Sequence, residues 1–197
     1  MFKRLFSPGS IGKMEVKNRL VMAPMGTRLS DDKGFVIPEM IDYYSERARG
    51  GTGLIITQTA RITSTAGQST RLGIHTDDCI SGLKKLTSSV QKNGAKIVIQ
   101  LAHHGMLMMM VGRPEGTDIL VPSMFPWMEA RGGFKELTIA ELSDYVEAFA
   151  EAVRRSRDAG FDGVEFHACH GCMLTTMMSP VTNRRTDKYG GSTENRV

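Results

Sequence analysis

Residues 162–196 read DGVEFHACHGCMLTTMMSPVTNRRTDKYGGSTENR. The apolar run at residues 161–166 predicts a buried strand, and it leads directly into His167 and His170. Gly171 follows, and then a Met-rich turn and a long polar loop. An apolar strand with polar side chains at its C-terminal tip and a long loop behind it is how an α/β barrel displays catalytic groups. We therefore predict that this tip carries the chemistry and that the rest of the chain holds it in place.

The spacing of His167 and His170 favours a pair of hydrogen-bond donors. Each neutral imidazole donates one N–H, and a protonated imidazole donates more strongly. Two donors that converge on one oxygen polarise a carbonyl and stabilise an enolate as charge develops there. The alternative is that either histidine is simply a hydrogen-bonded residue that ends the strand. We favour the donor pair because both histidines follow the same strand.

Cys169 and Cys172 form a C-x-x-C motif in the same stretch, which puts four potential metal ligands close together. A cluster this tight seldom surrounds one tetrahedral ion, and no second C-x-x-C or H-x-x-H completes a site elsewhere. Haem attachment requires a histidine directly after the second cysteine, where Met173 stands. A thioredoxin-type pair opens a helix in a small redox domain. We therefore expect no metal, and a metal or thiol-redox role is the less favoured alternative.

The composition is that of an ordinary globular protein. The chain has 197 residues, enough for one domain with a substantial core, and 41% of them are hydrophobic and 23% charged. The net charge is +4, but basic and acidic residues are interleaved, which argues against nucleic acid as a partner.

Neither end of the chain nor its interior carries a membrane or export signal. The N-terminus, MFKRLFSPGS, lacks the apolar segment of a signal peptide, and no apolar run is long enough to span a bilayer. Three cysteines do not make a disulfide framework. We therefore expect a cytoplasmic protein that contacts no membrane.

Strands and helices are expected to alternate along the chain. Residues 7–17 read as a hairpin with Gly12 and Lys13 at its turn. The apolar strands expected after the hairpin cover residues 18–23, 53–59, 96–101 and 161–166. The helices between them are expected at residues 39–49, from a cap at Asp77 or Asp78 to Gly94, and from a capping box at Thr138 and Glu141 to Gly160.

Two regions between these elements are also predicted. Residues 103–137 are expected to form a long connection that includes a run of methionines. The helix after it is expected to bury its apolar residues, which are Leu142, Tyr145, Val146, Phe149 and Val153.

This alternation of near-continuous apolar strands with helices indicates a parallel sheet covered by helices. A doubly wound sheet and a (β/α) barrel both fit it. No G-x-G-x-x-G opens the first helix, which counts against a dinucleotide-binding doubly wound fold. A barrel gathers all strand tips around one mouth, and polar or small residues follow each expected strand. These tips are Met25–Gly26–Thr27, Gln58–Thr59, Gln100, and His167 with His170.

Several motifs together resemble one known family. HACHG followed by SPVTNRRTDKYGGSTENR is similar to the signature of the old yellow enzyme family of FMN-dependent ene-reductases. NRLVMAPMGT, GLIITQT, LKKLTSSVQKNGAKIVIQLAHHG and ELTIAEL extend the resemblance over nearly the whole chain. The chain looks most similar to the bacterial branch with 2-enoate reductases, dienoyl-CoA reductases and bile-acid-type flavin reductases.

The resemblance implies a TIM (β/α)8 barrel with FMN at its C-terminal mouth, of which residues 1–197 are the N-terminal half. It implies that NAD(P)H reduces the flavin, which then reduces the activated C=C of an α,β-unsaturated carbonyl compound. Iron–sulfur and FAD domains are implied only for longer members. The residues implied along the flavin are Pro24, Met25, Gly26, Thr59 and Gln100, and those implied at the substrate carbonyl are His167 and His170.

Three departures from the family pattern qualify this interpretation. Cys172 stands where the family usually places a proton-donating tyrosine, so we expect its thiol at the mouth of the active site. The thiol is one candidate donor; the alternatives are a donor elsewhere, water, or a member that acts differently. Gly26 stands where a flavin-facing Cys or Thr is common. Four strands are half of a barrel, so we expect residues 1–197 alone to associate and to be inactive.

The expected partner is a small enone or enoate. The Met-rich segment with Phe125 and Trp127 indicates a bulky apolar one. We also expect a homo-oligomer. The alternative function is that of a non-catalytic flavin- or ligand-binding relative of the family.

Overall fold

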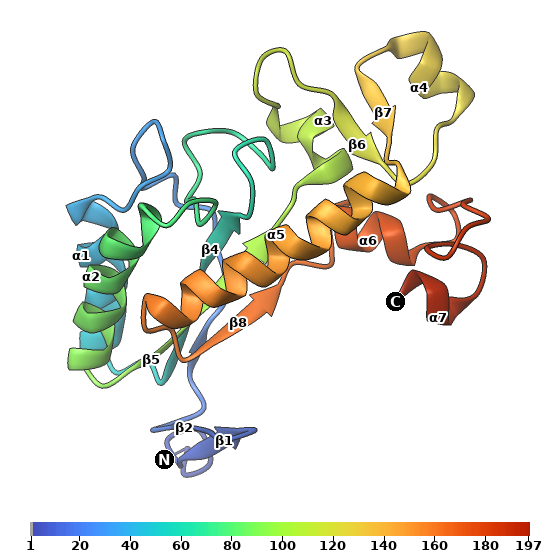
Figure 1. Ribbon diagram of the computed structural model, residues 1–197. Helices are drawn as coiled ribbons and strands as arrows, with labels where there is room; N and C mark the ends of the chain where they lie inside the picture. The colour runs from blue at the N-terminus through green and yellow to red at the C-terminus, as the bar shows by residue number, and fades with distance from the viewer. Residues whose placement is uncertain (1) are drawn as a thin grey trace.

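A parallel sheet of four strands forms the centre of the computed structural model, which describes residues 2–197 (Figure 1). The strands lie side by side in the order β3-β4-β5-β8. Their bounds are Val21–Met22 for β3, Leu54–Arg61 for β4, Lys96–Ala102 for β5 and Gly163–Phe166 for β8. Every neighbouring pair is parallel, as the alternation of strands and helices predicts.

The inner strands β4 and β5 are almost completely buried, but the edge strands are not. Val21 of β3 is 52% exposed and Phe166 of β8 is 48% exposed. The prediction of buried strands at residues 18–23 and 161–166 is therefore wrong about burial, and β3 is also much shorter than predicted. The physical reason is that an edge strand has a neighbour on one side only, so half of its surroundings are missing.

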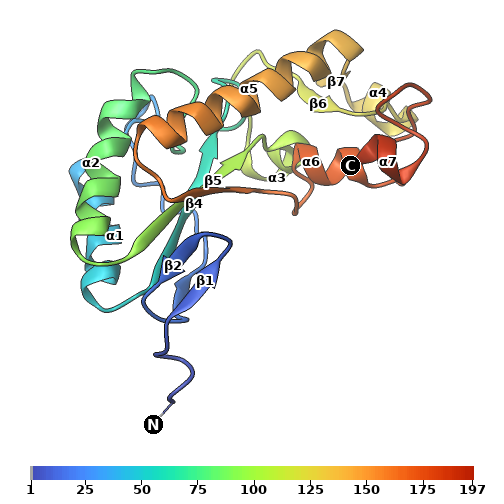
Figure 2. The same cartoon turned by 60° about the horizontal axis from the view of Figure 1, so that its bottom comes forward.

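Three long helices pack against the sheet: α1 (Pro38–Arg49), α2 (Cys79–Lys92) and α5 (Ile139–Asp158) (Figures 1 and 2). Their apolar stripes share one core cluster with the strands. The helical core residues include Met40, Tyr44, Ala48, Leu83, Leu86, Val90 and Ala152. The prediction that α5 buries Val146 and Val153 is wrong: Val146 is 59% exposed and Val153 is 36% exposed.

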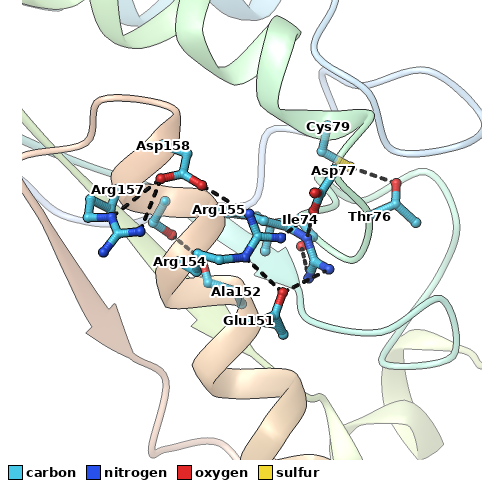
Figure 3. Close-up of polar contacts among 11 residues, drawn as sticks. Ile74, Thr76, Asp77, Cys79, Glu151, Ala152, Arg154, Arg155, Arg157 and Asp158 are labelled. Carbon is cyan, nitrogen blue, oxygen red and sulfur yellow. Dashed lines mark hydrogen bonds and ion pairs between the residues drawn. The ribbon is translucent and has the colours of Figure 1, made fainter.

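The two predicted helix caps have different outcomes. The capping box is confirmed: Thr138 Oγ1 accepts from Glu141 N–H at 3.2 Å, and Glu141 Oε2 accepts from Thr138 N–H at 3.0 Å. At α2, neither aspartate side chain caps the helix. The carboxylate of Asp77 instead pairs with Arg154 at 2.5 Å and Arg155 at 2.7 Å on α5 (Figure 3). Two guanidinium groups therefore outcompete the helix N–H groups for this carboxylate.

The predicted N-terminal hairpin is confirmed. Strands β1 (Gly9–Ile11) and β2 (Met14–Val16) pair antiparallel, and Gly12 at the turn has φ of 57°. The hairpin lies at the N-terminal ends of the sheet strands, opposite the loops that follow those strands (Figures 1 and 2).

The long connection at residues 103–137 contains structure of its own. Its elements are η1 (Gly105–Leu107), α3 (Met108–Val111), β6 (Ile119–Val121), α4 (Pro126–Arg131) and β7 (Phe134–Glu136). β6 and β7 form a second, parallel two-stranded sheet. Met108, Ile119, Val121 and Met128 form its small core, so most of the methionine-rich segment packs inward.

The C-terminal segment packs against this small sheet. It contains α6 (Met173–Met178) and α7 (Thr193–Arg196). The guanidinium of Arg185 joins the two parts by donating to Pro122 O at 3.0 Å and Leu137 O at 2.5 Å. Asp187 pairs with the same guanidinium at 2.5 Å, so its charge is balanced. No helix among residues 2–197 has the length and apolar character that crossing a membrane requires.

Candidate active site

A pocket of about 300 Å³ lies at the C-terminal ends of the four sheet strands. It is lined by Pro24, Met25, Gly26, Thr59, Arg71, Gln100, His104, Leu107, His167, Cys169 and His170. All the predicted site residues except Cys172 are therefore brought together from four separate parts of the chain. A larger open hollow of about 730 Å³ lies at the opposite end of the sheet, beside the hairpin, and contains none of these residues.

The two histidines of the predicted pair lie across the turn that follows β8. Their ring centroids are 5.4 Å apart, and the rings are tilted by 42°. His170 has φ of 56° and Gly171 has φ of 76°, so two left-handed residues in succession reverse the chain and bring His170 back over the pocket. Burial, and then the nearby His170, lower the pKa of His167. A neutral His167 presents one N–H donor at neutral pH.

The thiol of Cys169 lies between the two imidazoles. Its Sγ is 3.2 Å from His170 Nδ1 and 3.5 Å from His167 Nδ1. Cys169 and His170 are exposed, and His167 is half-buried. The donor pair is thus a cluster of three polar side chains open to the pocket.

Cys172 lies outside the pocket, so the prediction that its thiol stands at the mouth is wrong. Its side chain is completely buried, and burial followed by the nearby Cys169 raises its pKa to about 12. The reversal at His170 and Gly171 is the physical reason, because it turns the next side chain away from the strand tips. Cys172 then becomes the residue that precedes the first turn of α6.

Gln100 on β5 is held by its neighbour on β8. Its Nε2 donates to Glu165 Oε1 at 2.5 Å, and only 5% of the residue is exposed. A carboxylate accepts but does not donate, so Nε2 must face Glu165 and the carbonyl oxygen Oε1 is the group left to accept from a ligand. Thr59 Oγ1, on β4, lies 3.5 Å from His104 Nε2.

Four lining residues were not among the predicted site residues: Arg71, His104, Leu107 and Cys169. His104 had a usable signal, because His103 and His104 follow the strand at 96–101 just as the other polar tips follow theirs. Burial, and then Arg71, lower the pKa of His104 to about 4, so it is neutral. Arg71 lies in a loop rich in Ser, Thr and Gly without any periodic pattern, and only the tertiary structure brings it to the pocket.

Arg71 occupies space that the glycine at position 26 leaves free. A Cβ atom added to Gly26 would lie 3.3 Å from Arg71 Nη1, closer than most real contacts. Arg71 Nε is buried and has no hydrogen-bond partner among residues 2–197. Burial, and then Arg28, lower the pKa of Arg71. The pocket therefore contains a positive charge with an unsatisfied donor.

The loop that carries Arg71 is held by a second, fully buried arginine. Arg61 is 2% exposed, and its guanidinium donates to backbone carbonyl groups rather than to a carboxylate. Its acceptors are the carbonyl oxygens of Ser64 at 2.7 Å, Lys33 at 3.1 Å, Ser69 at 3.1 Å and Arg71 at 3.2 Å. One side chain thus ties two loops at the same end of the sheet.

Gln58 positions the other side of the pocket. Its Oε1 accepts from the backbone N–H groups of Thr27 at 3.0 Å and Arg28 at 3.3 Å, directly after Gly26. The N–H of Gln58 itself donates to Tyr44 Oη at 2.7 Å, which ties β4 to α1. The loop after β3 is therefore fixed by the sheet and not only by its own turns.

A parallel sheet covered by helices, with a pocket at the carboxyl ends of its strands, defines an α/β protein. The chain belongs to the NADH:flavin oxidoreductase / NADH oxidase family, whose model matches residues 4–197.

Curated relatives of this chain carry the names NADH oxidase and NADPH dehydrogenase. A protein named NADH oxidase from Thermoanaerobacter brockii is 40% identical over 198 residues, which cover 100% of this chain and 30% of the relative. A protein named NADPH dehydrogenase from Bacillus subtilis (strain 168) is 40% identical over 199 residues, which cover 100% of this chain and 57% of the relative. The chain thus spans about half, or less, of the curated relatives it matches.

Solved structures confirm the fold. Old Yellow Enzyme from Pichia sp. AKU4542 matches with a TM-score of 0.85 at 32% identity, covering 98% of this chain and 53% of that one. A 2-naphthoyl-CoA reductase complex matches with a TM-score of 0.89 at 31% identity, covering 100% of this chain and 32% of that one. The predicted TIM barrel is therefore correct, and this chain corresponds to the N-terminal portion of it.

Proposed function

We propose that the protein binds FMN in the pocket at the strand tips and uses NAD(P)H to reduce the activated C=C of an α,β-unsaturated carbonyl compound. One observation carries this proposal: the residues that resemble the flavin contacts and the histidine pair line a single pocket, although they come from four separate strands. Residues 1–197 then form the N-terminal half of the FMN-binding barrel domain.

The polar groups of the pocket suit an isoalloxazine ring. Gln100 Oε1 is available to accept from a ring N–H, because Nε2 is held by Glu165. Arg71 and His104 also line the pocket and add a guanidinium and a neutral imidazole to its polar surface. The backbone at Pro24, Met25 and Gly26 forms one wall. Bound FMN supplies the hydride chemistry, accepting from NAD(P)H and passing on to the alkene.

In this proposal His167 and His170 bind the carbonyl oxygen of the substrate. Their N–H groups polarise the C=C–C=O system and stabilise the negative charge that develops on the oxygen. The low pKa of His167 favours donation from a neutral imidazole over proton transfer. The proton that completes the reduction comes from a group other than Cys172 in this proposal, since that thiol is buried and does not line the pocket.

An apolar substrate fits the surroundings of the pocket. Leu107 lines it, and the adjoining cluster at Met106, Met109 and Phe125 offers adaptable apolar surface. Two similar structures are those of a morphinone reductase and a 2-naphthoyl-CoA reductase, whose names both refer to polycyclic compounds. We propose an enone or enoate with a bulky ring system as the substrate class. A homo-oligomer remains a prediction, which sedimentation equilibrium measures directly.

The proposal is tested with two half-reactions under anaerobic conditions. NADH or NADPH should bleach the flavin absorbance of the protein, and a cyclic enone added afterwards should restore it. A protein that binds FMN but is not reoxidised by enones or enoates of any ring size would instead be the non-catalytic flavin-binding relative. Failure to bind FMN would refute both alternatives.

A further inference from the structure

His167, Cys169 and His170 form a compact cluster of metal-ligating side chains. One ligand atom from each residue can be chosen so that all three lie within 4.8 Å of one another. The sulfur of Cys169 is 3.2 Å from His170 Nδ1, and 3.5 Å and 3.8 Å from His167 Nδ1 and Nε2. Cys169 takes no part in the flavin and carbonyl contacts of the proposed function.

These separations are those of ligands around one tetrahedral ion. Zinc binds thiolate sulfur at about 2.3 Å and imidazole nitrogen at about 2.0 Å, which places S and N about 3.5 Å apart at tetrahedral angles. The measured S···N distances of 3.2–3.8 Å bracket that value. The thiolate therefore already lies at the separation from each imidazole that a shared ion requires, and ligand nitrogens of the two imidazoles lie within 4.8 Å of each other.

Four potential ligands this close together in the sequence seldom surround one ion. The folded chain brings only three of them together. The reversal at His170 and Gly171 buries Cys172 and removes it from the set. Three ligands remain, and the fourth position faces the pocket. Three protein ligands with one open position is the arrangement of zinc sites that bind water or a substrate.

Ligand type and access select the kind of ion. One thiolate with two imidazoles favours zinc and similar borderline or soft cations over magnesium and calcium, which prefer oxygen. Cys169 and His170 are exposed, so an ion reaches them from solvent. A thiol that only hydrogen-bonds to imidazole has similar S···N distances. A metal site differs from such a hydrogen bond because it binds an added ion.

We propose that His167, Cys169 and His170 bind one zinc-like divalent cation, and that the bound ion blocks the carbonyl site of the enzyme. The second part rests on the proposed function, because it assumes that the same two histidines bind the substrate oxygen. The first part depends only on the three side chains.

Cobalt(II) is the probe for the site, because cobalt bound to thiolate has a sulfur-to-metal charge-transfer absorption that zinc lacks. Titration of the reduced full-length protein with Co²⁺ should develop this absorption at one ion per chain, and Zn²⁺ should abolish it. Cys169→Ala should remove the absorption. His167→Ala and His170→Ala should each weaken binding by more than about 100-fold, beyond the 10- to 100-fold typical of losing an outer partner of a metal ligand. Cys172→Ala is the matched control and should leave the titration unchanged.

The outcomes separate the two parts. Absorption that survives Cys169→Ala, or that disappears in Cys172→Ala, overturns the site, as does a titration that shows no band at all. For the second part, Zn²⁺ should slow flavin reoxidation by an enone, and EDTA should reverse this. Each variant is compared with its own metal-free rate, and Cys169→Ala should lose the inhibition. Cobalt binding without enone reduction would leave the site standing and contradict the proposed function instead.

Discussion

Gln100 and Glu165 lie opposite each other on the neighbouring strands β5 and β8, and the Gln100 Nε2–Glu165 Oε1 hydrogen bond between them is 2.5 Å long. The strand register brings them together, so the orientation of a pocket amide depends on a residue that does not itself line the pocket. Glu165 is therefore a positioning residue for the proposed flavin site.

Glu165→Gln should weaken FMN binding about 2- to 13-fold, which corresponds to one net hydrogen bond of about 0.5–1.5 kcal/mol. The replacement side chain both donates and accepts, so the Gln100 amide loses its single orientation. Quenching of flavin fluorescence measures the affinity. Glu147→Gln on the exposed side of α5 is the matched control, and equal affinity in the two variants would contradict the role of Glu165.

His167→Ala and His170→Ala should each slow reoxidation of the flavin by an enone about 10- to 1,000-fold, the scale of one lost oxyanion donor. Reduction by NAD(P)H should suffer less, because it involves no substrate carbonyl. His170→Asn retains a donor and should recover part of the loss. Stopped-flow absorbance resolves the two half-reactions, and wild-type reoxidation rates in both alanine variants would show that the pair does not bind the substrate.

Cys172→Ala should leave the rate and the incorporation of solvent deuterium unchanged, because this thiol is buried away from the pocket. Cys172→Tyr should lower the free energy of unfolding by about 1–3 kcal/mol, since it adds a ring to a packed site. Cys169→Tyr at an exposed position is the control and should change stability by less than about 0.5 kcal/mol. Loss of deuterium incorporation in Cys172→Ala would show instead that the thiol is the proton donor.

Arg71→Met should lower the reduction potential of the bound flavin. Reduction adds negative charge, and the variant removes a positive charge that lines the pocket beside Gly26. Gly26→Ala should also lower the reduction potential, but by a smaller amount, because the new Cβ displaces Arg71 Nη1 by a few tenths of an ångström. Arg49→Met, on the exposed end of α1, is the control. Titration against a reference dye measures the reduction potential. An unchanged potential in Arg71→Met would show that the charge of Arg71 does not act on the flavin.

The free energy of unfolding should fall as the pH falls from about 6.5 toward 3. His103 is 1% exposed, and burial, with a smaller effect of His104, lowers its pKa to about 3. Below about pH 6.5 the unfolded chain binds a proton at this position and the folded chain does not, so His103 contributes up to about 1.4 kcal/mol per pH unit. Urea denaturation at pH 7 and pH 5 measures the slope. His103→Gln cannot titrate and should show a shallower slope; identical slopes would exclude this contribution.

Local patterns in the sequence were sufficient for the N-terminal hairpin, the four strands of the sheet and the three long helices, but not for the short elements within residues 103–137. The hairpin at residues 7–17, the capping box at Thr138 and the alternation of apolar strands with helices depend on contacts between residues that are close along the chain. The positions of the pocket residues followed from the same patterns, because parallel strands present their carboxyl ends at one edge. This is why Thr59, Gln100 and His167 could be expected to meet.

Only the tertiary structure decided which side chains at those tips face the pocket. Two left-handed residues, His170 and Gly171, turn Cys172 into the core and leave Cys169 between the histidines, and a C-x-x-C pattern gives no sign of that difference. The loop that brings Arg71 to the pocket is held by the buried Arg61, which donates to Arg71 O and also to Lys33 O in another loop. The sequence by itself determined the elements and the edge at which the site lies. The direction of each side chain depended on contacts between distant residues, which no local pattern encodes.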